Sequence, residues 1–490
     1  MSDIKINLKN HLLFMESSVP FSSFSNNNLY EWAKPICEAL EDDGSISYLI
    51  SNRGRFRASP LASTIISLSR ENLIPNDVLD KMQEALLFLR DNPKANDSSK
   101  GCSSKNSDDF DGWSLSEGVS VWSTSMAIIA LIDNKGVGLL KASKFKNSVV
   151  WLANQRNVEY KGWGYQNTEN CTVNVIMTAL SIRALAKSFT NEAQNYFNFS
   201  AEENSLIKTS IIKGMEYLVD TCNQKKKYVY WDFNGKPNCA ATTWALLALK
   251  EASYIATDTI QDFINKNTKK GLLFVLSKMP SKSKRWEEEQ IVQETGAKYD
   301  SHKNYYSFSA TLIPELISLG LSPFHTKVVK QIQWIVNNKT SWKTKYDRSN
   351  ICSFTYAMLI STISCWIRCV GCVNAIHLLN SNNNVGNKVV EKLSGYSQKL
   401  NCPMFLIEKK KIIIYISLGL SVAIFILMRD HIVDLVQVFI KYIPFVNENL
   451  DSIGVNIVSS IFYGVSCFII SQLLKLLKRI FRIGEWLSHD

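Results

Sequence analysis

The chain has 490 residues, of which 46% are hydrophobic and 20% charged, and carries a formal net charge of +11. This composition excludes a disordered or fibrous chain and provides enough apolar residues for a large core. The 11 cysteines are too sparse for a disulfide-rich secreted scaffold, and the polar first ten residues lack a secretory signal, so we expect a cytosolic body with reduced thiols. Because basic residues are scattered outside the C-terminal region, we expect no specific nucleic-acid binding; the charge fits an anionic membrane surface.

A similar phrase returns six times along the chain: a loop with an aromatic residue, then a stretch with a threonine among small and apolar residues. The loop aromatics are Phe56, Trp113, Trp163, Trp231, Trp286 and Trp342, and the following threonines are Thr64, Thr124, Thr178, Thr243, Thr311 and Thr355. Successive loop aromatics are 50 to 68 residues apart, as expected of one repeated supersecondary unit. Apolar residues at helical spacing predict a helix pair in each unit, and hence an all-α fold. We expect each loop tryptophan to be packed, with its ring N–H bonded to backbone.

The insert between the second helix of the first unit and Trp113 is rich in Ser, Lys and Asn and is interpreted as a loop, residues 92–109. It runs into an acidic stretch, Asp108-Asp109-Phe110-Asp111, directly before Gly112. A solvated turn is the plain interpretation of these aspartates.

The most complete unit begins at Val149. Residues 149–152 read Val-Val-Trp-Leu, Gln155 follows, and residues 162–164 read Gly-Trp-Gly. This phrase resembles the tryptophan repeat of squalene and oxidosqualene cyclases and of protein prenyltransferase β subunits. The resemblance covers roughly residues 30–380. It implies an (α/α)6 toroid, in which six outer helices surround six inner ones and a central cavity. The inner helices would then begin near Pro60, Val119, Cys171, Cys239, Tyr305 and Ile351.

The catalytic motifs of the two enzyme classes do not accompany this resemblance. Cyclases of the family protonate their substrate with an Asp-x-Asp-Asp cluster at the start of an inner helix, where neighbouring carboxylates share a proton. The nearest candidate acids are Asp109 and Asp111, in the acidic stretch. Prenyltransferases need zinc held by Asp, Cys and His. Cys239 is near the matching position, but Asn238 precedes it and no histidine partner is evident, so we expect neither a metal site nor a cofactor.

Aromatic residues gather near the expected starts of the inner helices. They could line a pocket for an apolar ligand, stabilise a carbocation, or simply belong to the core. The candidates for ligand binding are Trp122, Trp244, Tyr305, Tyr306, Phe354 and Tyr356. The acidic residues 287–289 are interpreted as solvated loop charges. The cysteines at 365, 369 and 372 share one helix face; small core residues are the plain interpretation, and a metal or lipidation role stays open.

The C-terminal region contains two apolar runs. Residues 412–428 carry no charge, and as a helix rising about 1.5 Å per residue they span roughly 25 Å, close to a bilayer core. Lysines 409–411 and Arg429 flank this run, and a second run covers residues 453–474. The sequence therefore predicts three parts: a toroid domain (1–379), a polar linker (380–408) and a two-helix transmembrane hairpin with a basic tail (409–490). Buried helices of a soluble domain are the alternative.

Charge sets the expected orientation of this hairpin. The segments before the first run and after the second are basic, whereas the connection, residues 430–452, has four acidic residues against one lysine. The positive-inside rule then places both termini and the toroid in the cytoplasm, with a two-pass anchor in the inner (cytoplasmic) membrane.

Two functional hypotheses follow. The first is a membrane-anchored, non-catalytic toroid that binds a small-molecule ligand or a protein partner and acts through its hairpin. Such a protein could be a homo-oligomer and a membrane-disrupting effector, for example in bacterial defence. The second is a divergent terpenoid cyclase or prenyltransferase-like enzyme that acts on a membrane-soluble isoprenoid, with Asp109 and Asp111 as its acids.

Overall fold

The computed structural model describes residues 2–49, 52–91, 111–113, 119–134, 142–165, 172–291, 294–295, 298–299, 305–339, 342 and 352–380. The chain divides into two compact units, Met1–Met404 and Phe405–Asp490. All described residues belong to the first unit. The predicted hairpin, and all but the first residue of the predicted linker, therefore lie outside the described residues.

The described part of the chain is mostly helical, as the repeat predicts. Its α-helices are α1 (Asp3–Met15), α2 (Leu29–Ala39), α3 (Ala58–Arg70), α4 (Asn76–Asp91), α5 (Val121–Asp133), α7 (Ala142–Asn154), α8 (Val175–Ser188), α9 (Asn191–Phe197), α10 (Ala201–Asp220), α11 (Cys239–Glu251), α12 (Asp258–Lys278), α13 (Ile313–Ser318), α14 (Thr326–Asn337), α15 (Ser353–Val370) and α16 (Cys372–Asn380). Short 3-10 helices are η1 (Phe21–Ser23), η4 (Ser253–Ile255) and η5 (Ser309–Leu312).

Short antiparallel strands lie in the connections between helices. They are β1 (Ser47–Leu49), β2 (Asn52–Phe56), β3 (Asn223–Gln224), β4 (Val229–Phe233), β5 (Lys236–Asn238), β6 (Glu287–Ile291), β7 (Glu294–Thr295), β8 (Lys298–Tyr299) and β9 (Tyr305–Phe308). The pairings are β1 with β2, β3 with β4 and β5, β6 with β9, and β7 with β8. An inner helix was expected to begin near Tyr305, and this expectation is wrong: Tyr305 and Tyr306 lie in β9 opposite Ile291 and Glu289. The aromatic run favours a strand, and the helix starts only after it.

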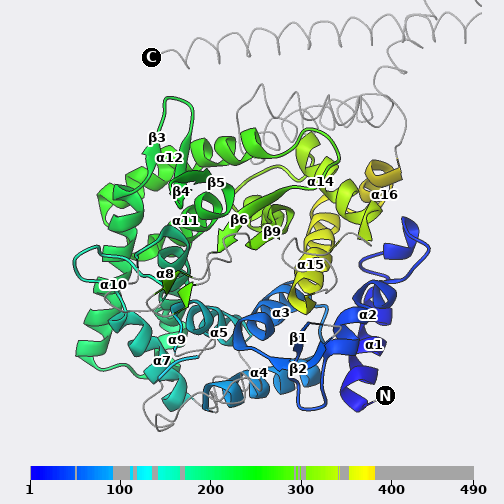
Figure 1. Cartoon of the computed structure of the whole chain (residues 1–490), viewed down its shortest axis with the longest axis horizontal. Helices are drawn as coiled ribbons and strands as arrows, with labels where there is room; N and C mark the ends of the chain where they lie inside the picture. The colour runs from blue at the N-terminus through cyan, green and yellow to red at the C-terminus, as the bar shows by residue number, and fades with distance from the viewer. Residues whose placement is uncertain are drawn as a thin grey trace, which may run out of the picture. The chain divides into compact units, whose positions relative to one another are not determined.

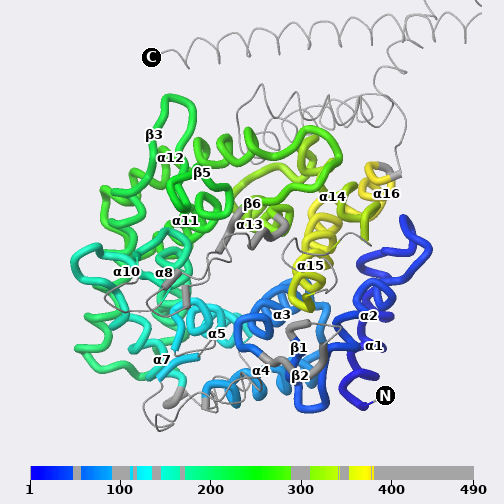
Figure 2. The backbone as a smooth tube through the Cα atoms, in the orientation of Figure 1, coloured from blue at the N-terminus to red at the C-terminus, as the bar shows by residue number. Residues whose placement is uncertain are grey.

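Six helices occupy the inner positions of the first unit and contact one another in chain order (Figure 1). α3 packs on α5, α5 on α8, and α8 on α11; η5 and α13 follow, and α15 packs on them and back on α3. These contacts make a closed circuit, and we call α3, α5, α8, α11, α13 and α15 the inner helices. α4, α7, α10, α12 and α14 lie farther out, each in contact with at least one inner helix (Figure 2).

Four tryptophans of the repeat join an inner helix to the outer helix before it; the inner helices are α5, α8, α11 and α15. The backbone N–H of three of them donates to a threonine Oγ1 in the first turn of the next inner helix; the pairs are Trp113–Thr124 (2.9 Å), Trp163–Thr178 (3.0 Å) and Trp231–Thr242 (3.1 Å). As predicted, the ring N–H bonds to backbone; the acceptors are the carbonyls of Leu86, Leu152 and Leu218, and that of Ile335 for Trp342. We call these contacts the tryptophan cradle.

The cradle corrects one residue of the predicted repeat. The threonine of the fourth unit is Thr242, and Thr243, which the repeat alignment selected, has a buried Oγ1 without a hydrogen-bond partner. Each cradle threonine stands four residues after the side chain that caps its helix, as Thr242 does after Asn238. A capping residue and a residue four positions later lie on one side of the first turn, so the cap spacing selects the threonine.

One described helix is long and apolar enough to cross a membrane, namely α15, and 78% of it is buried inside the protein. Core helices of soluble proteins pass the same test, so α15 is weak evidence for a membrane span. Its contacts with α3, η5 and α13 make it the element that closes the circuit.

Candidate functional site

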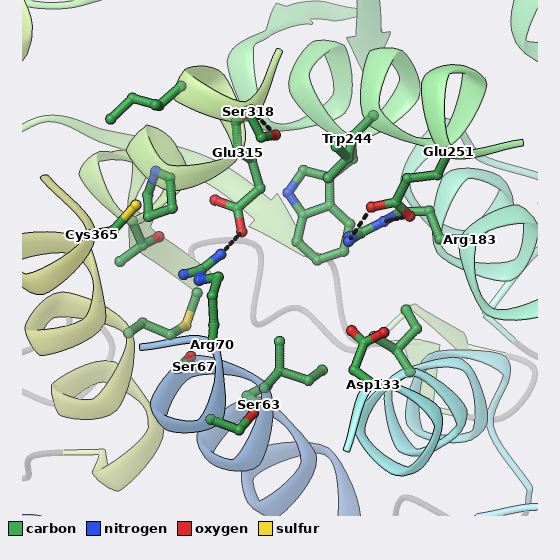
Figure 3. Close-up of a pocket in the computed structure, with 18 of the residues that line it drawn as sticks. Ser63, Ser67, Arg70, Asp133, Arg183, Trp244, Glu251, Glu315, Ser318 and Cys365 are labelled. Atoms are coloured by element: carbon green, nitrogen blue, oxygen red, sulfur yellow. Dashed lines mark hydrogen bonds and ion pairs between the residues drawn. The ribbon is translucent and has the colours of Figure 1, made fainter. Parts of the chain in front are cut away.

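A cavity of about 660 Å³ opens where the last turns of the inner helices converge (Figure 3). Its wall comes from every inner helix. The lining includes Ser63, Ser67 and Arg70 of α3, Met126, Ile129 and Asp133 of α5, Arg183 and Lys187 of α8, Trp244, Leu247 and Glu251 of α11, Pro314, Glu315 and Ser318 of α13, and Met358, Cys365, Arg368 and Cys369 of α15. Because these positions mostly fall near the carboxyl ends of their helices, the inner helices run parallel, and we treat this cavity as the candidate site.

Ion pairs between different inner helices surround the cavity. With shortest N···O distances, they are Lys187–Asp133 (2.6 Å, α8 to α5), Arg183–Glu251 (2.9 Å, α8 to α11), Arg70–Glu315 (2.6 Å, α3 to α13) and Arg368–Glu71 (3.1 Å, α15 to the end of α3). We call these four pairs the charged belt. Three of its cations, Arg70, Lys187 and Arg368, stand in the last turn of their helices, where a positive charge offsets the negative end of the helix dipole.

Burial makes the belt electrostatically strong. Arg183 donates two hydrogen bonds to Glu251, from Nε at 2.9 Å and Nη2 at 3.2 Å. Burial by itself disfavours both charges, but the arginine more than compensates at Glu251, and the pKa of this carboxyl is lowered. The carboxylate in turn keeps the pKa of Arg183 raised despite its burial. Both groups are therefore ionised at neutral pH, and neither is suited to exchange a proton with a bound molecule.

Trp244 is the one predicted ligand residue that the described cavity wall contains. The guanidinium carbon of Arg183 lies 5.9 Å from the centre of its ring, and Trp122 stacks on it at 5.8 Å with an interplanar angle of 18°. Its ring nitrogen is buried and has no hydrogen-bond partner. Figure 3 shows that nitrogen on the side of the ring that faces Glu315. A buried N–H without a partner is costly, so this donor is available to a ligand.

Glu315 offers the complementary group. Its Oε1 accepts from Arg70, whereas its Oε2 is buried without a partner. Arg70 is fixed from a second side, because its Nη2 also donates to Ser361 Oγ at 3.1 Å. The cavity thus presents a free donor on α11 and a free acceptor on α13, next to apolar atoms of Met126, Ile129 and Leu247. This combination suits a small polar molecule that carries both an acceptor and a donor.

The other predicted ligand residues lie elsewhere. Trp122 supports Trp244 from behind, and Tyr356 packs on Trp342 at 5.1 Å between ring centres. Phe354 is half-buried in the first turn of α15, at the opposite end from the cavity. Tyr305 and Tyr306 lie in β9. The structure therefore brings Trp122 and Trp244 together but not the remaining aromatics.

Of the two predicted acids, the structure describes only Asp111, which does not line the cavity. Asp109 lies outside the described residues. The Asp111 side chain is 50% exposed, and its Oδ1 lies 3.9 Å from Nη2 of Arg90, which also donates to Ser148. This position, before Trp113, fits the solvated turn that the sequence suggests.

Sequence reasoning missed the role of Glu288. The acidic residues 287–289 were interpreted as solvated loop charges, and for Glu288 this is wrong. It stands in β6, and its Oε2 accepts from the backbone N–H of Cys239 at 2.7 Å, at the first turn of α11. Burial raises the pKa of this carboxyl, although the thiol of Cys239, backbone N–H groups and Lys278 act against that rise. No local pattern marks this contact, because it joins residues 49 positions apart.

Within the described ranges, no group of three or more His, Cys, Asp or Glu side chains is placed to hold a metal ion. Neither a protein-family model nor a curated protein matches this sequence.

Proposed function

We propose that residues 1–379 form an (α/α)6 toroid of six helix-pair repeats, that its cavity binds a small polar ligand without catalysing a reaction, and that residues 409–490 form a two-helix membrane hairpin that carries the output. The tryptophan repeat and the closed circuit of inner helices support the toroid. The apolar runs with basic flanks support the hairpin.

The observation that carries this proposal is the state of the carboxylates at the cavity. Among the described lining residues there are three, Asp133, Glu251 and Glu315, and each is paired with a lysine or arginine. A cyclase needs a carboxylic acid that keeps its proton until it meets the substrate. A carboxylate paired with a cation holds its charge instead, so the cavity is better suited to binding than to acid catalysis.

The charged belt also offers a route from binding to output. Each pair joins two inner helices, and a ligand that engages Glu315 Oε2 competes with or reinforces the Arg70 link between α3 and α13. Breaking or strengthening one ion pair changes the relative free energies of two arrangements of the helices that it joins. A ligand-controlled switch requires such a change.

The ligand is tested by asking what the purified full chain carries. Native mass spectrometry of the detergent-solubilised chain should detect a bound small molecule, and Trp244→Phe should lose it, because an aromatic ring remains while the free N–H is removed. Trp151→Phe, which changes a half-buried tryptophan on α7, is the matched control and should retain it. Equal occupancy in all three chains would count against the cavity as the site.

The output is tested in liposomes of phosphatidylethanolamine and phosphatidylglycerol loaded with a fluorescent dye. The full chain should release the dye, and a chain that ends at Cys402 should not. Such a result makes the protein a membrane-permeabilising effector, as in bacterial defence, acting as a homo-oligomer when leakage rises more than linearly with protein. Tight liposomes with the full chain, free and crosslinked, would reduce the hairpin to an anchor.

A further inference from the structure

The last turns of α15 bring two cysteines to the cavity wall. Cys365 and Cys369 are separated by one helical turn, both line the cavity, and the thiol of Cys365 hydrogen-bonds to the sulfur of Cys369. Cys365 is buried and Cys369 half-buried. Residues at this spacing have Cβ atoms about 5–6 Å apart, wider than the ~4 Å of a disulfide, so the helix keeps them as a thiol pair.

Two arginines and one carboxylate surround the pair; the carboxylate belongs to Glu71, which pairs with Arg368 and opposes ionisation of both thiols. Nη2 of Arg368 lies 3.9 Å from Cys365 Sγ, and Arg70 approaches from α3. The hydrogen bond from Cys365, followed by the charge of Arg368, outweighs burial and lowers the pKa of Cys369 to about 7. The same hydrogen bond raises the pKa of Cys365, so this thiol stays protonated and donates to Cys369. The Cys369 thiol therefore ionises more readily than an ordinary thiol, which stays protonated at neutral pH.

We propose that Cys365 and Cys369 form a two-thiolate site for a soft monovalent metal ion, of which Cu(I) is the representative. Thiolates select Cu(I), and two sulfurs complete its coordination, whereas zinc in proteins takes four ligands. Metal–thiolate bonds of about 2.3 Å allow one ion to bridge sulfurs up to ~4.6 Å apart without unwinding the helix. This site lies on a different wall of the cavity from Trp244 and does not require the small molecule proposed above, but Arg70 borders both sites.

Binding of Cu(I) changes no oxidation state, so it requires no oxidant. Cu(I) bonds to the Cys369 thiolate and to the sulfur of Cys365, and the proton of Cys365 leaves to solvent, as metal binding to thiols requires. The product carries one negative charge, which Arg368 and Arg70 stabilise, and Glu71 holds Arg368 in place through two hydrogen bonds of 3.1 and 3.3 Å.

The test is a competition for Cu(I) between bicinchoninate and the full chain in detergent. The chain should take one more equivalent of Cu(I) than Cys365→Ser or Cys369→Ser, with a loss of affinity at that site of more than about tenfold in each variant. Cys372→Ser, which removes a half-buried thiol just beyond α15, is the control and should bind as the original chain does. Zn(II) should not compete. Identical Cu(I) uptake by all four chains would overturn the proposal.

A second measurement needs no substitution. In the original chain, maleimide labelling followed by peptide mass spectrometry should modify Cys369 rapidly, and Cu(I) should suppress this labelling at least about tenfold while leaving Cys372 unchanged. Equal labelling of Cys369 with and without Cu(I) would contradict the site, whether or not the serine variants fold.

Discussion

The two ends of the inner helices are built on different principles. At the amino ends, the tryptophan cradle repeats from unit to unit with uncharged groups: a tryptophan N–H, a threonine hydroxyl and a capping side chain. At the carboxyl ends, the charged belt and the thiol pair surround a cavity, and each unit contributes a different set of side chains. The repeated contacts therefore hold the inner helices together, whereas the side chains that differ from unit to unit form the candidate site.

The largest expected effect comes from breaking one belt pair on one side only. Glu251→Gln leaves the buried charge of Arg183 without its carboxylate, and should lower the free energy of unfolding by about 3 kcal/mol. Thermal unfolding of the full chain in detergent measures this loss. The double variant Arg183→Met with Glu251→Met removes both charges and should cost less than Glu251→Gln alone. A single variant as stable as the original would show that the belt carries no structural energy.

At the amino ends of the inner helices, we expect added side-chain volume in the tryptophan cradle to lower stability. A Cβ at Gly162 would lie 2.5 Å from Val173 Cγ1 and 2.7 Å from Thr178 Oγ1, too close for either neighbour to accept without moving. Gly162→Ala should therefore destabilise the protein by roughly 2 kcal/mol. Gly235→Ser is the control for backbone alone, because nothing lies within 4 Å of a Cβ there and the positive φ of 70° is its only strain. A loss at Gly162 that does not exceed the loss at Gly235 would show that the close contacts of the cradle carry no cost.

These two ends also differ in how far the sequence could predict them. The sequence predicts that Trp113, Trp163 and Trp231 are buried with their ring N–H bonded, because each unit shows the same aromatic residue followed by a threonine. The belt cannot be predicted in this way, because Arg70 and Glu315 are 245 residues apart and meet only when the circuit closes. Trp244 was selected from its place near a helix start, but its free N–H depends on α13, which the repeat placed too early.

A pair of variants at Thr242 and Thr243 tests which threonine belongs to the tryptophan cradle. Thr242→Val removes the acceptor of the Trp231 N–H and should cost about 1–2 kcal/mol, because that buried donor is left without a partner. Thr243→Val has the same change in shape, but its Oγ1 has no partner to lose, so stability should stay the same or rise. Urea unfolding of the two variants side by side decides the point. A larger loss at Thr243 would restore the repeat alignment made from sequence.

The smallest effect concerns the one carboxyl that the structure places at the amino end of α11. Burial raises the pKa of Glu288 above its ordinary value, so the folded state holds this proton more tightly than the unfolded chain does. The stability that results is fully present below the ordinary pKa and is lost as pH rises through the folded one. Glu288→Gln keeps an acceptor for the Cys239 N–H and carries no titrating proton. Relative to the original chain, it should therefore gain stability as pH rises above the ordinary pKa of a glutamate, about 4.3, and through the raised pKa of Glu288.

Glu216 on α10 supplies the opposite sign for the same measurement. Burial alone would raise its pKa, but Lys213 and Lys161 lower it, so its contribution is present above the ordinary pKa and is lost as pH falls through the lowered one. Relative to the original chain, Glu216→Gln should lose stability as pH rises from the lowered pKa of Glu216 to the ordinary pKa, a range that lies below the one in which Glu288→Gln gains it. Parallel slopes for the two variants would mean that Glu288 is ion-paired like Glu216, and that charge is as much a part of the amino ends as of the carboxyl ends.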